Sequence, residues 1–263
     1  MAAYTIISIV YAQYDERELD MDLYLPPEPS GGSLPVVMVI PVGGWRSCQK
    51  REDVPWLVDY GFAVAVIECR VVPEVIAPAT IHDCKAGVRW LRAHGAEYGL
   101  DADRIGTFGS SAGGHLSALM AVSAGVAELE GDGGNADVSS AVQASYDQCG
   151  PTDLERMADA DLAAASPVLE EVTYNFLGGP VGERRDLARL MSPLTYVSPG
   201  APPILIVHGE DDPTVPVAES VVFHEALIAA GVDAALHRLP GQGHSLPQDL
   251  TAPIVAEFFQ RVL

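Results

Sequence analysis

Positive charge is scarce in this 263-residue sequence. Only 15 residues are lysine or arginine, against 36 aspartates and glutamates, and the formal net charge is -21. Lysine occurs only at Lys50 and Lys85. Nucleic-acid phosphates bind to basic surfaces, and no basic cluster is present. The charge balance therefore argues against a nucleic-acid partner.

Long apolar runs are also missing. No run approaches the roughly 20 residues that a membrane-spanning helix needs. The first ten residues lack the basic start and long apolar centre of a signal peptide. The "VYAQ" at residues 10–13 weakly resembles a cleavage site, but few apolar residues precede it. We therefore expect a soluble, cytoplasmic protein without a membrane partner, with secretion as the less favoured alternative.

Cysteines are few and widely separated. They stand at Cys48, Cys69, Cys84 and Cys149, and their spacing matches no common metal-ligand motif. A chain of this length can bury a large core without disulfide bonds. We expect free thiols and no bound metal.

Short apolar runs and helix-like segments alternate along the chain. Two runs around the polar turn "YDER", residues 14–17, predict an antiparallel hairpin. The later runs are continuously apolar, which is typical of strands covered on both faces. They are "VVMVI" (36–40), "FAVAVI" (62–67), "IGTF" (105–108), "AVQASY" (141–146), "ILIV" (204–207) and "AALHRL" (234–239).

Between these runs lie segments with helical spacing, clearest at residues 79–98 and also present at 51–60. The alternation predicts an α/β fold with a mostly parallel sheet of about eight strands and helices on both faces. We expect one domain over residues 1–263, with a small insertion around 153–200. The glycine-rich, acidic segment 125–137 is expected to be a surface loop.

The stretch "GTFGSSAGGH" places two serines between glycines, directly after an apolar run and before a helix-like segment. Residues 109–113 match the G-x-S-x-G pattern in the strand–turn–helix context that a nucleophile elbow requires. The glycines make room for a strained turn, and the serine hydroxyl is exposed at the helix N-terminus. Ser111 is therefore the predicted nucleophile. Ser110 is the alternative, but it lacks glycines two residues to either side.

A serine hydroxyl needs a base to remove its proton and a carboxylate to orient that base. With a nucleophile elbow, the expected chain order is Ser, then Asp or Glu, then His. Asp212 follows an apolar run in "ILIVHGEDDPTVP", and His244 follows the last predicted strand in "LPGQGHSLP". Both loops should open beside Ser111, because ligands bind at the carboxyl ends of the strands in open α/β sheets.

Other residues compete for these two roles. Asp211 adjoins Asp212, and its charge is more typical of a solvent-facing loop. His208 is expected to brace the loop that carries Asp212, and His115 is expected to pack beneath the elbow. The other histidines fall within predicted helices or a strand, and His244 is therefore the predicted base. Those four are His82, His94, His224 and His237.

Acyl transfer also places negative charge on a carbonyl oxygen, which preset N–H donors stabilise. One donor is expected from Ala112, directly after the nucleophile. The other is expected from Gly43 or Gly44 in "PVGGW", because glycine lets an oxyanion approach the backbone. An ordinary turn is the alternative explanation of these two glycines.

With these residues assigned, the chain resembles α/β-hydrolases of the esterase/lipase kind, and among them the bifunctional feruloyl and acetylxylan esterases. The resemblance runs nearly end to end. The segments that carry it are "LDMDLYLPP", "GGWRS", "IHDCKAGVRWLRAHGAEYGLDADRIGTFGSSAGGHLSALMA", "VQASYDQCGPTDL", "SPLTYVSPGAPPILIVHGEDDPTVP" and "LHRLPGQGHS".

The oxyanion loop departs from the family pattern. Relatives usually carry His-Gly-Gly-Gly-Trp, whereas here Pro41 and Val42 precede the two glycines and Trp45, and Cys48 stands where glycine is common. Proline removes one N–H group and valine adds bulk. We expect Val42 and Trp45 to line the substrate pocket and to narrow its acyl side.

The residues and the resemblance together predict a serine carboxylesterase that uses no cofactor. The resemblance implies acetyl-type or feruloyl esters as small-molecule substrates, including esters derived from plant cell walls. Short acyl chains are expected because the segment 153–200, broken by prolines and rich in acidic residues, contains no obvious long amphipathic lid. The alternative enzyme is an amidase or formamidase, because related hydrolases with a similar glycine–tryptophan loop cleave small amides. A non-catalytic binding scaffold is a further alternative, since a fold does not prove activity.

Overall fold

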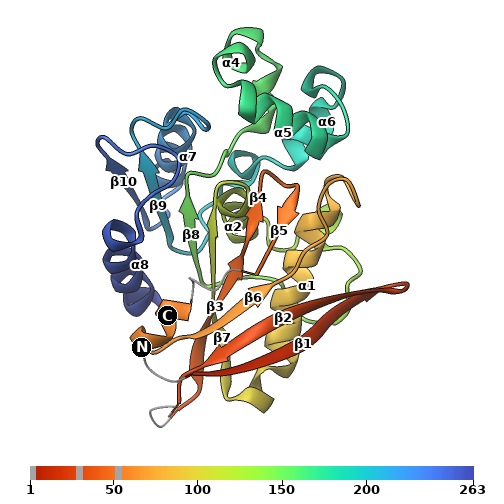
Figure 1. The fold of residues 1–263 in the computed structure, drawn as a ribbon, viewed down its shortest axis with the longest axis vertical. Helices are drawn as coiled ribbons and strands as arrows, with labels where there is room; N and C mark the ends of the chain where they lie inside the picture. Colours follow the sequence, from red (N-terminus) through yellow and green to blue (C-terminus); the bar gives the residue numbers. More distant parts are fainter. Residues whose placement is uncertain (1–3, 28–31, 51–54) are drawn as a thin grey trace.

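The computed structural model describes residues 4–27, 32–50 and 55–263. Within these ranges, eight strands form one sheet with helices on both faces, and two short strands form a separate hairpin (Figure 1). The strands of the sheet are β1 (Thr5–Tyr14), β2 (Arg17–Leu25), β3 (Leu34–Ile40), β6 (Ala63–Ile67), β7 (Leu100–Ser110), β8 (Ala144–Gln148), β9 (Ile204–Gly209) and β10 (Ala234–Leu239). The hairpin consists of β4 (Val42–Gly43) and β5 (Ser47–Cys48).

Helices connect most of the parallel strands. The α-helices are α1 (Ala79–His94), α2 (Ala112–Val122), α3 (Ala127–Glu130), α4 (Ala160–Ala165), α5 (Pro167–Leu177), α6 (Arg185–Leu190), α7 (Ala218–Ala229) and α8 (Gln248–Val262). Short 3-10 segments are η1 (Pro55–Tyr60), η2 (Gly95–Tyr98), η3 (Leu154–Ala158), η4 (Val181–Glu183) and η5 (Pro193–Tyr196). No helix in the described ranges is both long and apolar enough to cross a membrane.

The spatial order of the strands is β1-β2-β6-β3-β7-β8-β9-β10. The β1–β2 and β2–β6 pairs are antiparallel, and every pair from β6 to β10 is parallel. The predicted α/β class, with a mostly parallel sheet and an antiparallel entry hairpin, is confirmed.

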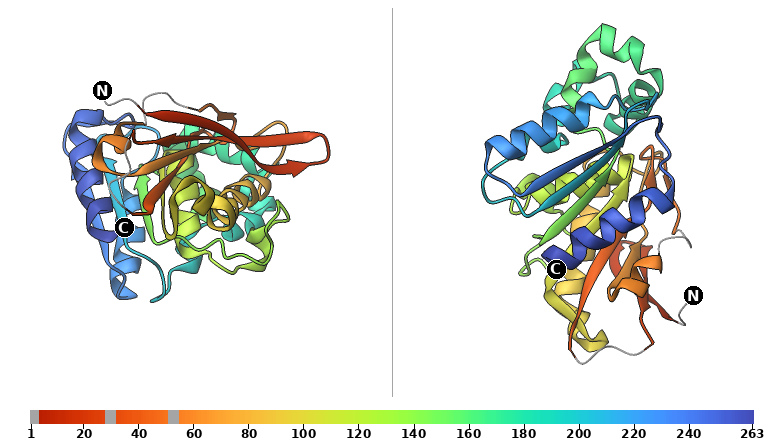
Figure 2. Two further views of the ribbon diagram at one scale, coloured as in Figure 1. Left: turned by 90° about the horizontal axis from the view of Figure 1, so that it is seen from below. Right: turned by 90° about the vertical axis from the view of Figure 1, so that its left-hand side faces the viewer.

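The central strands are buried on both faces, which explains their continuous apolarity. In β3, Val36 and Met38 pack into the core formed with α1, α2 and α7, whereas Val37 and Val39 pack into a second core with α8 and η1. Successive side chains of a strand point to opposite faces, so one run supplies both cores. Figure 2 shows α7 and α8 on opposite sides of the sheet.

Several predicted boundaries shift in the structure. The predicted strand at residues 141–146 is β8, which begins at Ala144. Before it, the carbonyl oxygens of Ser139 and Ala141 accept hydrogen bonds from the Arg92 side chain. The predicted loop 125–137 contains α3, and the predicted helix 79–98 ends in the 3-10 turn η2. The predicted helix 51–60 begins outside the described residues, and its described part is η1.

The segment 153–200 forms a layer of short helices. Figure 1 shows α4, α5 and α6 together beyond the carboxyl ends of the parallel strands. The inner side of α5 is apolar and buried at Leu169, Val172 and Phe176. This layer therefore covers the edge of the sheet at which ligands bind in open α/β folds.

Candidate active site

Ser111 occupies a sharp turn between β7 and α2. Its φ of 57° is positive, a conformation that non-glycine residues adopt rarely and that is typical of functional sites. A Cβ on Gly109 would lie 2.0 Å from the carbonyl oxygen of Gly113, and one on Gly113 would lie 2.2 Å from that of Ile40. Both motif glycines are thus required by close backbone approaches. The N–H of Ser111 donates to the Gln148 carbonyl oxygen at 2.7 Å, which ties the turn to β8.

Three side chains from separate loops meet at this turn. The Ser111 hydroxyl donates to His244 Nε2 over 2.8 Å, and His244 Nδ1 donates to Asp212 Oδ2 over 2.7 Å. Asp212 follows β9 and His244 follows β10, so adjacent parallel strands deliver them to one edge. The His244 side chain is 23% exposed and that of Asp212 is fully buried. The geometry suits proton transfer away from the serine hydroxyl.

The Asp212 carboxylate accepts four hydrogen bonds. Burial opposes its ionisation, but hydrogen bonds from His208, His244 and the backbone N–H groups of Thr214 and Val215 hold its pKa well below the usual range. Asp212 therefore stays an anion that can stabilise a positively charged His244.

None of the competing residues contacts Ser111 Oγ in place of His244 or His244 Nδ1 in place of Asp212. Asp211 is exposed. His208 is buried, accepts a hydrogen bond from Ser220 and donates to Asp212 Oδ2, the same oxygen that accepts from His244. Ser110 accepts a hydrogen bond from Gln148.

The predicted oxyanion residues surround Ser111. Gly43, Gly44 and Ala112 line one cavity together with the serine. Gly44 has a φ of +52°, and a Cβ there would lie 3.3 Å from Val172 of α5. Glycine therefore suits both the turn and the packing of the β4–β5 hairpin against the helical layer.

Trp45 anchors this hairpin. Its ring stacks on Phe176 with 4.6 Å between centroids, and its indole N–H donates to His115 Nδ1 over 3.1 Å. His115 Nε2 in turn donates to the Met191 carbonyl oxygen at 2.7 Å. Burial lowers the pKa of His115 to about 4, so this histidine stays neutral and fixes the hairpin over α2.

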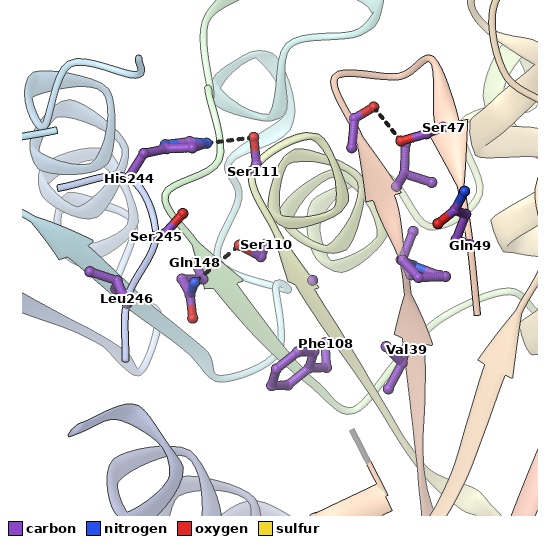
Figure 3. A pocket seen from close by; sticks show the side chains of 15 residues that line it. Val39, Ser47, Gln49, Phe108, Ser110, Ser111, Gln148, His244, Ser245 and Leu246 are labelled. Atoms are coloured by element: carbon purple, nitrogen blue, oxygen red, sulfur yellow. Dashed lines mark hydrogen bonds between the residues drawn. The ribbon is translucent and has the colours of Figure 1, made fainter. Parts of the chain in front are cut away.

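Two cavities flank Ser111 and share it with Gly43, Ser47 and His244. One, of about 460 Å³, we call the polar cavity; its polar side chains are Ser47, Gln49, Ser110, Gln148 and Ser245 (Figure 3). The other, of about 380 Å³, we call the apolar cavity; its apolar side chains include Trp45, Pro151, Val168, Leu169, Val172 and Val215.

The prediction that Val42 and Trp45 narrow the same side of the pocket is wrong. Val42 lines the polar cavity and Trp45 lines the apolar one. The β4–β5 hairpin reverses direction between them and separates their side chains. Leu169 and Val172 were not among the predicted pocket residues. Their i, i+3 spacing in an apolar helical segment is the sequence signal for them.

One group of three metal-binding side chains occurs in the described part of the chain. Donor atoms of Cys149, Asp212 and His244 lie within 4.8 Å of one another. The oxygens of Asp212, however, already accept hydrogen bonds from two histidines and two backbone N–H groups. The arrangement therefore fits a hydrogen-bonded carboxylate better than a metal ligand.

A second carboxyl group is buried beneath the elbow. Asp147 in β8 accepts a hydrogen bond from the Gly150 N–H at 2.9 Å, but its Oδ2 has no partner. Burial raises the pKa of Asp147 to about 6. The folded protein therefore holds this proton more tightly than the unfolded chain, and the resulting stabilisation is lost as pH rises from about 4 to about 6.

We expect Asp147→Asn to remove this loss. The free energy of unfolding of the variant minus that of the wild type should increase by on the order of 2–3 kcal/mol between pH 4 and pH 7. Urea unfolding across this range measures the difference, with exposed Asp137→Asn as the matched control. A difference in free energy of unfolding that stays constant with pH would contradict the raised pKa of Asp147.

Comparison with known proteins identifies the chain's relatives. The BD-FAE family model matches residues 21–227. The chain is 34% identical over 246 residues to the esterase LipQ of Mycobacterium tuberculosis, an alignment that covers 90% of this chain and 56% of LipQ. The chain spans about half the length of the first curated relatives that it matches.

Solved structures agree with this result. A truncated carbohydrate esterase from gut microbiota superposes with a TM-score of 0.82 at 30% identity, covering 98% of this chain and 96% of that one. The butyrate-bound esterase Est2 of Thermogutta terrifontis gives a TM-score of 0.80 at 27% identity, covering 97% and 94%. The chain has the α/β-hydrolase fold and belongs to the BD-FAE family.

Proposed function

We propose that the protein is a serine carboxylesterase that hydrolyses esters of short acyl groups through an acyl-enzyme. The observation that carries the proposal is the continuous hydrogen-bond chain from Ser111 through His244 to Asp212, at 2.8 and 2.7 Å, between two cavities. The esterases among its relatives support the same reaction class.

In the proposed reaction, Ser111 Oγ attacks the acyl carbon while His244 Nε2 takes the hydroxyl proton. The backbone N–H groups of Ala112 and of Gly43 or Gly44 stabilise the oxyanion, and Asp212 stabilises the imidazolium. His244 then protonates the departing alcohol oxygen as the ester C–O bond breaks. A water molecule, deprotonated by His244, then attacks the acyl carbon. The bond to Ser111 Oγ breaks, His244 returns the proton to that oxygen, and the acid is released.

The apolar cavity is proposed to hold the acyl group. Leu169 and Val172 of α5 and Trp45 of the hairpin close this side of Ser111 with apolar surface. Related structures of the Thermogutta esterase contain propionate or butyrate, which supports a short acyl chain. Acetyl-type and feruloyl esters, including those derived from plant cell walls, are the substrates that family membership favours.

Ser111→Ala should lower kcat for 4-nitrophenyl acetate by several orders of magnitude, because the nucleophile is lost. A fluorophosphonate probe should label the wild type at Ser111 and leave the variant unlabelled, as mass spectrometry of the peptides would show. The exposed Ser198→Ala is the control and should retain both activity and labelling. Labelling at another serine would refute the assignment, and faster turnover of 4-nitroacetanilide than of the ester would indicate an amidase.

Asp212→Asn should reduce kcat roughly 1,000-fold or more, because the amide cannot stabilise the imidazolium of His244 in the same way. Asp211→Asn is the matched control: the same chemical change one residue away, on an exposed side chain, should leave kcat close to that of the wild type. Comparable losses in both variants would show that Asp212 has no special role.

Acyl chains of roughly two to four carbons should be preferred over long ones. Methylene groups that extend beyond the apolar cavity stay in water and do not contribute the binding free energy of about 0.8 kcal/mol that each buried methylene supplies. A series of 4-nitrophenyl esters from acetyl to decanoyl tests this through kcat/KM. Leu169→Ala enlarges the apolar cavity and should move the optimum toward longer chains, whereas exposed Leu250→Ala should not. A decanoyl optimum in the wild type would contradict the proposal.

A further inference from the structure

The apolar cavity has an exposed end at which charged and apolar side chains stand together. Its inner walls, Trp45, Leu169 and Val172, are buried. Val168 also lines the cavity but is 48% exposed, and the exposed Arg46 lines it too. The cavity therefore leads from a buried apolar interior to a rim where an arginine meets water.

Arg46 lies at the tip of the β4–β5 hairpin, and its side chain covers a glycine of the predicted oxyanion loop. The Arg46 N–H donates to the Gly43 carbonyl oxygen at 3.1 Å. A Cβ built on Gly44 would lie 3.3 Å from Val172, 3.6 Å from Arg46 Nε and 3.7 Å from Arg46 Cγ. Arg46 and Val172 of α5 therefore come together over Gly44.

The guanidinium group of Arg46 joins the hairpin to α5. Its Nη1 donates to Glu171 Oε1 over 3.0 Å. Glu171 lies three residues after Val168 and directly before Val172, so these side chains neighbour one another on the helix. Figure 1 shows α5 beyond the hairpin, at the edge of the sheet where the parallel strands end. The ion pair thus crosses from the hairpin tip to the part of α5 that carries the exposed valine.

Fold stability does not explain this ion pair. The side chains of Arg46 and Glu171 are 53% and 63% exposed, and pairs this exposed contribute little to the free energy of unfolding. The hairpin is already fixed to α5 by the stacking of Trp45 on Phe176. What distinguishes the pair is its position at the rim of the apolar cavity.

An acyl chain that is too long for the buried interior would meet this pair. Methylene groups at the rim would remove water from the two charges without replacing the lost hydrogen bonds. The neighbouring Val168 offers apolar surface on which the same methylene groups could be buried. The ion pair therefore disfavours the longer chains that the valine by itself would favour.

We infer that the ion pair between Arg46 and Glu171 closes the outer end of the apolar cavity and sets the upper limit of acyl chain length. The inference rests on the proposed ester hydrolysis, with the acyl group in this cavity. A short acyl group lies between the buried walls and does not reach the pair, whereas a longer one must separate the two charges. Loss of their attraction should therefore favour long chains over short ones.

Charge reversal tests the inference. The measured quantity is kcat/KM for 4-nitrophenyl hexanoate divided by kcat/KM for the butyrate, which shares the scissile bond and the leaving group. A disturbance of Gly43 or Gly44 therefore affects both esters alike and cancels in this ratio. Arg46→Glu and Glu171→Arg each place like charges at the rim and should raise the ratio at least about 4-fold, the effect of burying one further methylene group.

The double variant Arg46→Glu, Glu171→Arg restores opposite charges at the rim. It should return the ratio to within about 2-fold of the wild-type value, although each single change raises it. Such a reversal distinguishes attraction between the two side chains from an effect of either side chain alone.

Arg189→Glu is the matched control. It makes the same chemical change in another ion pair of the helical layer, where Arg189 Nε lies 3.0 Å from Glu155 Oε2 and neither residue lines the apolar cavity. The ratio should keep its wild-type value. Thermal unfolding verifies that each variant is folded, and Arg46→Met, which removes the charge but keeps a long side chain, carries the test with the same expected rise if a reversed variant does not fold.

The outcomes separate this inference from the proposed function. Hydrolysis that depends on Ser111, with a ratio that neither single reversal raises or that the double variant does not lower again, would overturn the inference and leave the esterase in place. An equal rise in Arg189→Glu would also overturn it, because the effect would then not depend on the rim. Absence of Ser111-dependent hydrolysis of either ester would overturn both.

Discussion

The close approach of the β7–α2 turn to its neighbours is the constraint on which the rest of the site depends. Only glycine fits at positions 109 and 113, where added Cβ atoms would lie 2.0 and 2.2 Å from backbone oxygens. Between these two glycines, Ser111 adopts a positive φ of 57°, rare for a non-glycine residue, directly before the first residue of α2. The same turn places Ala112 directly after Ser111, so one local geometry brings together the proposed nucleophile and a proposed oxyanion donor.

A second constraint fixes the oxyanion hairpin relative to this turn. Trp45 stacks on Phe176 of α5 and donates to His115, which lies on α2 four residues after the nucleophile. The hairpin, the helical layer and the elbow helix are thus linked through buried side chains. In this arrangement Gly43 and Gly44 line the same cavity as Ser111.

The two cavities beside Ser111 differ in the side chains that line them. On one side of Ser111, Leu169, Val172 and Trp45 present apolar surface, and on the other side Ser110 and Gln148 present oriented donors. This difference in lining is the basis on which the apolar cavity is proposed to hold the acyl group. His115 in α2 remains neutral, because burial disfavours its charged form.

The sequence by itself determined the fold class and the reacting residues that we propose. Continuous apolar runs identified the parallel strands, and the G-x-S-x-G spacing identified Ser111, because each pattern reflects a local steric requirement. Asp212 and His244 followed from their places after successive strands, since parallel strands end at one edge of a sheet.

Only the tertiary structure decided what surrounds them. The separation of Val42 from Trp45 depends on a hairpin of two-residue strands, too short to leave a periodic signal. The wall formed by Leu169 and Val172 depends on how the helical layer packs over the sheet edge. Tyr146 donates a hydrogen bond to Gln148 within β8, and Gln148 donates to Ser110 of the adjacent strand β7, 38 residues away in sequence. Such contacts arise from packing at a distance along the chain, which local sequence patterns do not encode.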